Sequence, residues 1–245
     1  MLRIDCGEYQ SDHEVSKLIG SPPGYLGHRE TPPLLNQQKV DSFSSDKSEL
    51  CILVFDEIEK ASDAMARLLL GILDKAFLRL GDNSTVNFER CLIFLTSNLG
   101  SKEMQVAKVG FGEKTAGFNK QAAHKALRAK FSPEFRNRID NIVVYKTLGR
   151  EECRTILQQL TQEFQRLVGE RLYKRSFKLE LSEPAREEIL NIGVSKENGA
   201  RELRRTAERE LMQPLCSLIA AEKIKPSSTV LLDYADGQFV FLERR

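Results

Sequence analysis

The sequence predicts an α/β fold, with a parallel sheet and flanking helices first and a small α+β domain after it. Three short apolar runs, Cys51–Phe55, Cys91–Leu95 and Ile142–Tyr145, have the length and composition of strands buried on both faces of a parallel sheet. The segment Leu2–Asp5 predicts a fourth strand, at an edge. Between the first two runs, apolar residues recur at helical spacing over residues 62–76. The first part of the chain therefore contains a strand, helix, strand unit.

Local signals place the ends of two helices. Ser62 precedes the helix between the first two strands and is a suitable N-cap. In FSPEFRNRID, Ser132 is a second N-cap and Pro133 takes the first helical position, where its missing N–H costs nothing. A short helix should therefore lead into the third strand.

The character of the sequence changes near residue 148, so we divide the chain into domains at 1–148 and 149–245. The second domain is dominated by long charged segments. We expect helices at 151–172, 184–192 and 201–223, the last interrupted near Pro214, and strands at 176–182, 228–234 and 238–244. The sequence Ala235-Asp236-Gly237 joins the last two strands and predicts a hairpin.

Composition and charge exclude several classes of protein. The 245 residues carry 37 Lys and Arg against 35 Asp and Glu, a net charge of +2, which gives no electrostatic basis for binding nucleic acid or a membrane surface. The five cysteines are scattered without a CxxC pair, so neither a disulfide framework nor a zinc site is expected. No apolar segment is long enough to span a bilayer. We expect a cytoplasmic protein.

The segment CILVFDEIEK ends an apolar strand in two adjacent carboxylates, Asp56 and Glu57. Such a pair suits a nucleotide-bound Mg²⁺: the first carboxylate holds the metal through water, and the second activates the water that attacks the terminal phosphate. Asn98, in TSN at the end of the next strand, would lie beside them and help fix that water. A solvated acid pair without a catalytic role is the alternative.

Two arginines complete the set of candidate site residues. Arg138 lies in the sequence RNR before the third predicted strand, from which an arginine can reach the phosphates held by a neighbouring subunit. Arg201 begins a long helix just after Gly199, a position from which it can cover a nucleotide. A basic helix face is the alternative interpretation of RNR.

An ordered series of motifs resembles a known family. LIGSPPGYLG, VFDEIEKA, TSNLGS, FSPEFRNRID and GARELRR, over about residues 2 to 240, resemble the C-terminal ATPase module of the Clp family of AAA+ protein unfoldases (ClpA/ClpB/ClpC-like). The resemblance implies an AAA+ P-loop-type sheet followed by a small helical lid, with ATP and Mg²⁺ as cofactors. It also implies a hexameric ring that acts on unfolded or tagged proteins.

The resemblance assigns a role to each site residue. By it, Asp56 and Glu57 are the Walker B pair, Asn98 is sensor 1, Arg138 is the arginine finger and Arg201 is sensor 2.

The motif GYLG corresponds to the pore loop of the family. Gly24 and Gly27 give a mobile backbone around Tyr25 and Leu26, so that the exposed aromatic ring can grip an extended chain without reading its sequence. In isolation such a motif is more often just a turn. The prolines at 32 and 33 depart from the pattern of the family, so we extend the resemblance no further than Gly27.

The tripeptide Val109-Gly110-Phe111 resembles the segment with which some Clp ATPases dock onto the ClpP peptidase. The alternative is a loop whose apolar residues fold back onto their own domain.

The 245 residues contain no ATP-binding loop of the form GxxxxGK[ST]. The nearest match, GFGEKT at 110–115, has Glu113 where the second glycine is required, and a carboxylate there would repel phosphate. By resemblance, the strand that leads into that loop lies between Cys91–Leu95 and Ile142–Tyr145, so without it we expect both to expose ladder groups and apolar side chains.

Two hypotheses follow from this deficit: an N-terminally incomplete copy of an active ATPase, or a short inactive or regulatory paralogue that still offers Arg138 to a neighbour. A DNA-acting AAA+ motor is a third alternative. It predicts clustered Lys and Arg beside Tyr25, and no such basic run is present.

Overall fold

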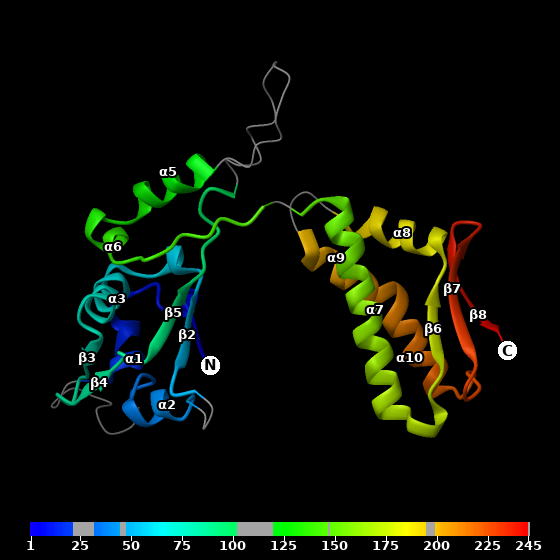
Figure 1. Cartoon of the computed structure of the whole chain (residues 1–245), viewed down its shortest axis with the longest axis horizontal. Coiled ribbons are helices and arrows are strands. Elements are labelled where there is room, and N and C mark those ends of the chain that lie inside the picture. Colours follow the sequence, from blue (N-terminus) through cyan, green and yellow to red (C-terminus); the bar gives the residue numbers. More distant parts are fainter. Residues whose placement is uncertain (22–31, 45–47, 102–119, 147, 195–198, 245) are drawn as a thin grey trace, which may run out of the picture. The chain divides into compact units, whose positions relative to one another are not determined.

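The structure is a computed structural model of the chain (Figure 1). It describes residues 1–21, 32–44, 48–101, 120–146, 148–194 and 199–244. The chain divides into two compact units, Met1–Val144 and Tyr145–Arg245, and each is described by itself. The domain boundary expected after residue 148 stays a prediction.

The first unit is built on a parallel sheet of three strands, in the order β1-β2-β5. These strands are β1 (Leu2–Asp5), β2 (Cys51–Asp56) and β5 (Cys91–Leu95). In the register of the ladder, Leu53 of β2 lies opposite Leu2 on one side and Ile93 on the other. The edge position of β1 and the first two predicted strands are confirmed.

One face of this sheet carries the core of the first unit. Ile4, Leu53 and Phe55 are almost fully buried, and they belong to the same apolar cluster as the inner face of α3 (Asp63–Lys75). The predicted cap of α3 is confirmed, because the hydroxyl of Ser62 accepts a hydrogen bond of 3.3 Å from the Met65 N–H. The helix therefore begins where the sequence places it and covers this face (Figure 1).

The opposite face of the sheet is open among the described residues. Leu92 and Phe94 of β5 are 47% and 52% exposed, so the prediction that these strands are buried on both faces was wrong. The prediction of a strand at Ile142–Tyr145 was also wrong: the segment is extended but pairs with no described strand, and Val143 is 67% exposed. A strand needs a neighbour to bond its backbone, and none of the described segments supplies one. The exposure agrees with that expected for a sheet without the strand that leads into an ATP-binding loop.

Smaller elements surround this sheet. The hairpin of β3 (Phe77–Arg79) and β4 (Thr85–Asn87) was not predicted. Nor were several short helices: η1 (Cys6–Glu8), η2 (Asp12–Val15), α1 (Ser16–Ile19), α2 (Gln37–Asp41), η3 (Ile58–Lys60) and the longer α5 (Lys120–Lys130). The predicted helix α6 (Pro133–Asn137) is confirmed, with the Ser132 hydroxyl accepting from the Phe135 N–H at 3.2 Å.

The second unit combines helices with a three-stranded sheet, and the helices lie to one side of that sheet (Figure 1). Its elements are α7 (Arg150–Leu172), η4 (Tyr173–Arg175), β6 (Lys178–Leu181), α8 (Glu183–Gly193), α9 (Gly199–Ala207), the π-helical turn η5 (Glu208–Met212), α10 (Gln213–Ala220), β7 (Thr229–Ala235) and β8 (Gln238–Arg244). The strand order is β6-β7-β8, with β6 parallel and β8 antiparallel to β7. The predicted helices and strands of this unit are confirmed.

Two local features of the second unit follow from particular residues. Asp236 and Gly237 join β7 to β8 with φ of 53° and 79°, the left-handed conformations that a tight hairpin turn requires. The long helix predicted over 201–223 is interrupted, as expected, near Pro214: it is divided into α9, η5 and α10, and the π-helical turn η5 ends two residues before Pro214. Within the described residues, no helix is both long enough and apolar enough to cross a membrane.

The close approach of α8 and α9 gives a testable prediction. A Cβ at Gly193, the last residue of α8, would lie 2.9 Å from the Leu203 Cα of α9. We expect Gly193→Ala to lower the free energy of unfolding by about 1–3 kcal/mol through overpacking. In the control Gly169→Ala, on α7, the new methyl group meets nothing within 4 Å, so a gain of about 0.5–1 kcal/mol is expected. Urea unfolding measures both, and equal effects would contradict this account.

Candidate functional site

The carboxyl ends of β1, β2 and β5 meet at one edge of the sheet, because the three strands are parallel and in register. Asp56 is the last residue of β2 and Glu57 follows it, while Thr96 and Asn98 follow β5. In open parallel sheets, ligands bind at this edge. The sequence predicts that Asn98 lies near the acid pair. In the structure its side chain contacts Glu57 directly, as described below.

The Asp56 carboxylate is held on both oxygens. One oxygen accepts a hydrogen bond from the Thr96 hydroxyl, and the other accepts from the guanidinium of Arg3, with which it forms an ion pair. Arg3 lies on the neighbouring strand β1, and its hydrogen bond to Asp56 raises the pKa of the guanidinium. The carboxylate is thus fixed in place and its charge is balanced by a cation of the same unit.

Glu57 has an unusual backbone and two polar partners. Its φ and ψ of 54° and 48° lie in the left-handed region, which is uncommon outside glycine. The Glu57 N–H donates to the Thr96 hydroxyl at 3.1 Å. Its carboxylate accepts from Lys60 Nζ at 2.5 Å and from the Asn98 side-chain amide at 3.3 Å. The same Glu57 contact raises the pKa of Lys60.

Asn98 is itself held at the backbone. Its N–H donates to Glu59 Oε1 at 3.1 Å, while the second oxygen of Glu59 is buried without a hydrogen-bond partner among the described residues. The structure therefore adds Thr96, Glu59, Lys60 and Arg3 to the residues that the sequence singled out. Of these four, only Lys60 could have been found from the sequence, because it lies three residues after Glu57, a spacing at which the two side chains can pair. The roles of the others depend on the register of the sheet.

The chemistry of this donor set fits Mg²⁺ bound with a nucleotide. Mg²⁺ prefers oxygen ligands, keeps several of its waters and is commonly bound by one or two carboxylates together with phosphates. Both oxygens of Asp56 are already hydrogen-bonded, so a contact through water requires the least change. Among the described residues, no group of three or more His, Cys, Asp and Glu side chains could hold a metal by itself. Most of the ligands would therefore come from phosphate and water.

Arg138 lies apart from these contacts. It ends α6, and its guanidinium forms an ion pair of 2.6 Å with Asp74, in the last turns of α3. The helix that carries it is anchored by the buried Phe135 ring, which stacks on Phe131 at 5.0 Å between centroids. Arg138 is thus a half-exposed cation directly after a helix that packing holds in place.

The remaining predicted site residues are not joined to the acid pair by the structure. Arg201 lies exposed on α9, in the second unit. The motif of Gly24, Tyr25, Leu26 and Gly27 lies outside the described residues. The same holds for the possible docking tripeptide of Val109, Gly110 and Phe111.

The double role of the Thr96 hydroxyl can be tested by an isosteric change. Thr96→Val removes the acceptor of the Glu57 N–H and the donor to Asp56, so we expect it to lower the free energy of unfolding by about 1 kcal/mol. Thr96→Ser keeps the hydroxyl and serves as the control, with a smaller loss expected. Urea unfolding followed by circular dichroism measures the difference. Equal stability of the two variants would show that these bonds contribute nothing.

Comparison with known proteins matches both units in chain order. Residues 1–142 match the family model described as the AAA domain (Cdc48 subfamily). Residues 148–232 match the model described as the C-terminal, D2-small domain of ClpB protein.

Curated relatives and a solved structure agree with these matches. The chain is 35% identical over 248 residues to the chaperone protein ClpB of Aquifex aeolicus, covering 100% of this chain and 24% of that protein. It is 35% identical over 244 residues to an ATP-dependent Clp protease ATP-binding subunit ClpA homolog of Guillardia theta, covering 96% of this chain and 28% of that protein. A closed-state reconstruction of Hsp104 with ATPyS and FITC casein superposes with a TM-score of 0.78 at 29% identity, covering 99% of this chain and 39% of that chain.

The chain thus spans about a quarter of the length of the curated relatives it matches. Its two units correspond in order to the AAA domain and to the small domain that follows it in ClpB. The chain belongs to the Clp family of AAA+ ATPases, as a homologue of the C-terminal module of ClpB, ClpA and Hsp104.

Proposed function

We propose that this chain is a subunit of a ring-shaped, ATP-dependent protein unfoldase. The observation that carries the proposal is the fixed acid pair at the carboxyl edge of the sheet, with Asn98 hydrogen-bonded to Glu57 at 3.3 Å. Carboxylates in this position suit the metal and the water of phosphate hydrolysis. Membership of the Clp family supports the choice of ATP as the nucleotide.

In this proposal each polar residue of the edge has one task. Asp56 holds Mg²⁺ through water, and Glu57 takes the proton of the attacking water. Asn98 and Lys60 keep the Glu57 carboxylate oriented. Bound Mg²⁺ would supply charge stabilisation of the phosphates. The ion pair with Arg3 balances the charge of Asp56 when no metal is present.

Two arginines act from outside the acid pair. Arg138 is the finger that reaches a nucleotide on the next subunit of a hexamer, and Arg201 contacts the nucleotide from the small domain. The fixed position of α6 and the exposed guanidinium of Arg138 support the first role. The second role rests on the family resemblance of GARELRR.

The proposed polypeptide substrate and peptidase partner are supported by two sequence motifs and by the matched Hsp104 structure. Tyr25, between glycines, would grip an extended polypeptide in the channel of the ring, and Val109-Gly110-Phe111 would dock a ClpP-type peptidase. The matched Hsp104 structure is described as a complex with FITC casein, which supports unfolded protein as the class of substrate. A cytoplasmic location accompanies this proposal. The net charge of +2 disfavours a DNA-acting motor.

A second candidate is an inactive or regulatory subunit. The 245 residues contain no GxxxxGK[ST], the loop that would hold the phosphates. Such a subunit would not hydrolyse ATP but would still offer Arg138 to its neighbour. The coding sequence upstream of Met1 separates the two. An in-frame GxxxxGK[ST] there supports the catalytic subunit, whereas a nearby in-frame stop codon supports the regulatory one.

The finger role of Arg138 is common to both candidates and can be measured in mixed rings. The partner in the mixture is a Clp-family subunit that has its own ATP-binding loop but carries alanine at its finger position. We expect the wild-type chain to restore ATP hydrolysis and Arg138→Ala to lose about 10³-fold or more of that gain.

Arg90→Ala is the matched control for this assay, because Arg90 is also an exposed arginine in an ion pair, with Glu49. It should restore hydrolysis as the wild type does. Equal restoration by Arg138→Ala, in rings of equal composition, would rule out the finger role.

A further inference from the structure

Among the strands that the structure describes, none covers one edge of β6. The Lys178 N–H donates to Ser228 and the Ser182 N–H to Leu232, both at 2.9 Å, which fixes the side of β6 that faces β7. Because strand residues alternate, Leu179 and Leu181 direct their N–H and C=O groups away from β7. The sheet order β6-β7-β8 leaves that edge of β6 open.

A side chain already satisfies the first part of this edge. The Gln165 amide of α7 donates to the Phe177 carbonyl at 2.9 Å and accepts from the Leu179 N–H at 2.6 Å. A residue of an added parallel strand would make the same pair of bonds, one to residue i−1 and one from residue i+1. The edge therefore accepts an amide group in this geometry.

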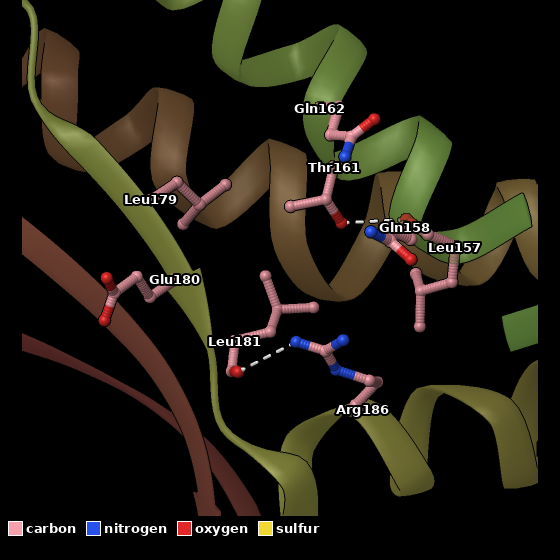
Figure 2. A pocket seen from close by; sticks show the side chains of 8 residues that line it. All are labelled: Leu157, Gln158, Thr161, Gln162, Leu179, Glu180, Leu181 and Arg186. Carbon is pink, nitrogen blue, oxygen red and sulfur yellow. Dashed lines mark hydrogen bonds between the residues drawn. The ribbon is translucent and has the colours of Figure 1, made fainter. Parts of the chain in front are cut away.

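The next pair along the edge is open. The Leu179 carbonyl and the Leu181 N–H have no hydrogen-bond partner among the residues that the structure describes. They border a cavity of about 310 Å³ between α7, β6 and α8 (Figure 2). Its lining residues are Leu157, Gln158, Thr161, Gln162, Leu179, Glu180, Leu181 and Arg186.

A guanidinium lies at one end of this cavity. Arg186 donates through Nη2 to the Leu181 carbonyl at 3.3 Å (Figure 2). Its Nε is buried without a hydrogen bond in the described part of the chain, and the Glu183 carboxylate is 3.7 Å away. Glu183 is closer to Arg154, at 2.6 Å. The bond to Leu181 uses one N–H of Nη2, so the terminal nitrogens of the guanidinium keep further N–H groups for another acceptor.

Glu180, the other charged residue that lines the cavity, does not compete for the position beside Arg186. Glu180 extends to the side of β6 away from the cavity (Figure 2), where it forms an ion pair of 2.7 Å with Lys178. The Gln158 side chain points toward Arg186 across the cavity (Figure 2) and makes no hydrogen bond to a described residue. The apolar wall is formed by Leu157 and Leu181.

We propose that this cavity binds the C-terminal residue of a polypeptide whose preceding residues turn away from β6, because Gln165 occupies the preceding position along the edge. The N–H of that residue donates to the Leu179 carbonyl, one carboxylate oxygen accepts from the Leu181 N–H, and the other accepts from Arg186. An apolar terminal side chain packs against Leu157. An internal residue of a peptide would satisfy the strand edge but would offer Arg186 no carboxylate oxygen, so the free carboxylate is what the site selects.

Fluorescence anisotropy with two peptides tests the proposal on the full chain. Both are N-acetylated, dye-labelled hexapeptides of one leucine-terminated sequence; one ends in a free carboxylate and the other in a carboxamide. We expect the carboxylate peptide to bind at least about tenfold more tightly. Arg186→Gln should reduce its affinity to that of the carboxamide. Arg175→Gln, which removes an exposed arginine paired with Glu222 instead, is the matched control and should leave binding unchanged.

A second variant keeps the test conclusive if Arg186→Gln fails to fold. Gln158→Trp should fill the cavity from α7 and abolish binding while leaving the circular dichroism spectrum and the melting temperature unchanged. Equal affinity for the two peptides, no binding of either, or undiminished binding by Arg186→Gln or Gln158→Trp would each overturn the proposal. The assay contains no nucleotide, so its outcome is independent of the proposed ATP hydrolysis.

Discussion

Parallel pairing of β1, β2 and β5 is the constraint on which the candidate site depends. It brings three chain segments, far apart in sequence, to one edge of the sheet. The Thr96 hydroxyl then joins two of them, because it donates to Asp56 and accepts from the Glu57 N–H. Arg3 joins the third through its ion pair with Asp56. The left-handed backbone of Glu57 is held by its N–H bond to Thr96 and by the bonds that its carboxylate accepts from Lys60 and Asn98.

The same sheet shows where the first unit has apolar surface to cover. Parallel sheets normally have both faces covered, and here α3 covers one, while Leu92 and Phe94 lie about half exposed on the other. Ile52 lies opposite Leu92 in the ladder and is 37% exposed, so the open surface is continuous across two strands. Contiguous apolar surface of this kind marks a place where another segment packs. The β5 edge and its open face are therefore the part of the first unit most sensitive to what lies against it.

Sequence reasoning succeeded where a single local signal decides the structure. Ser62, Ser132 and the Asp236-Gly237 pair each specify a cap or a turn through their own chemistry, and each was found in the expected place. It failed at Ile142–Tyr145, because apolar composition does not reveal whether a strand partner is present. The proximity of Asn98 to the acid pair was predicted correctly, since the ends of adjacent parallel strands must meet.

The residues that sequence reasoning missed, Arg3, Thr96 and Gln165, act through register or tertiary position. Each of them satisfies a charged or backbone group that the end or edge of a strand leaves open. Thr96 does this for Glu57, and Gln165 does it for β6. Native structures leave few such groups unpaired. The Leu179 carbonyl and Leu181 N–H beside Arg186, unpaired among the described residues, therefore indicate a binding site more strongly than the cavity alone does. The second unit therefore carries, in Leu179, Leu181 and Arg186, a recognition surface whose chemistry is independent of nucleotide hydrolysis.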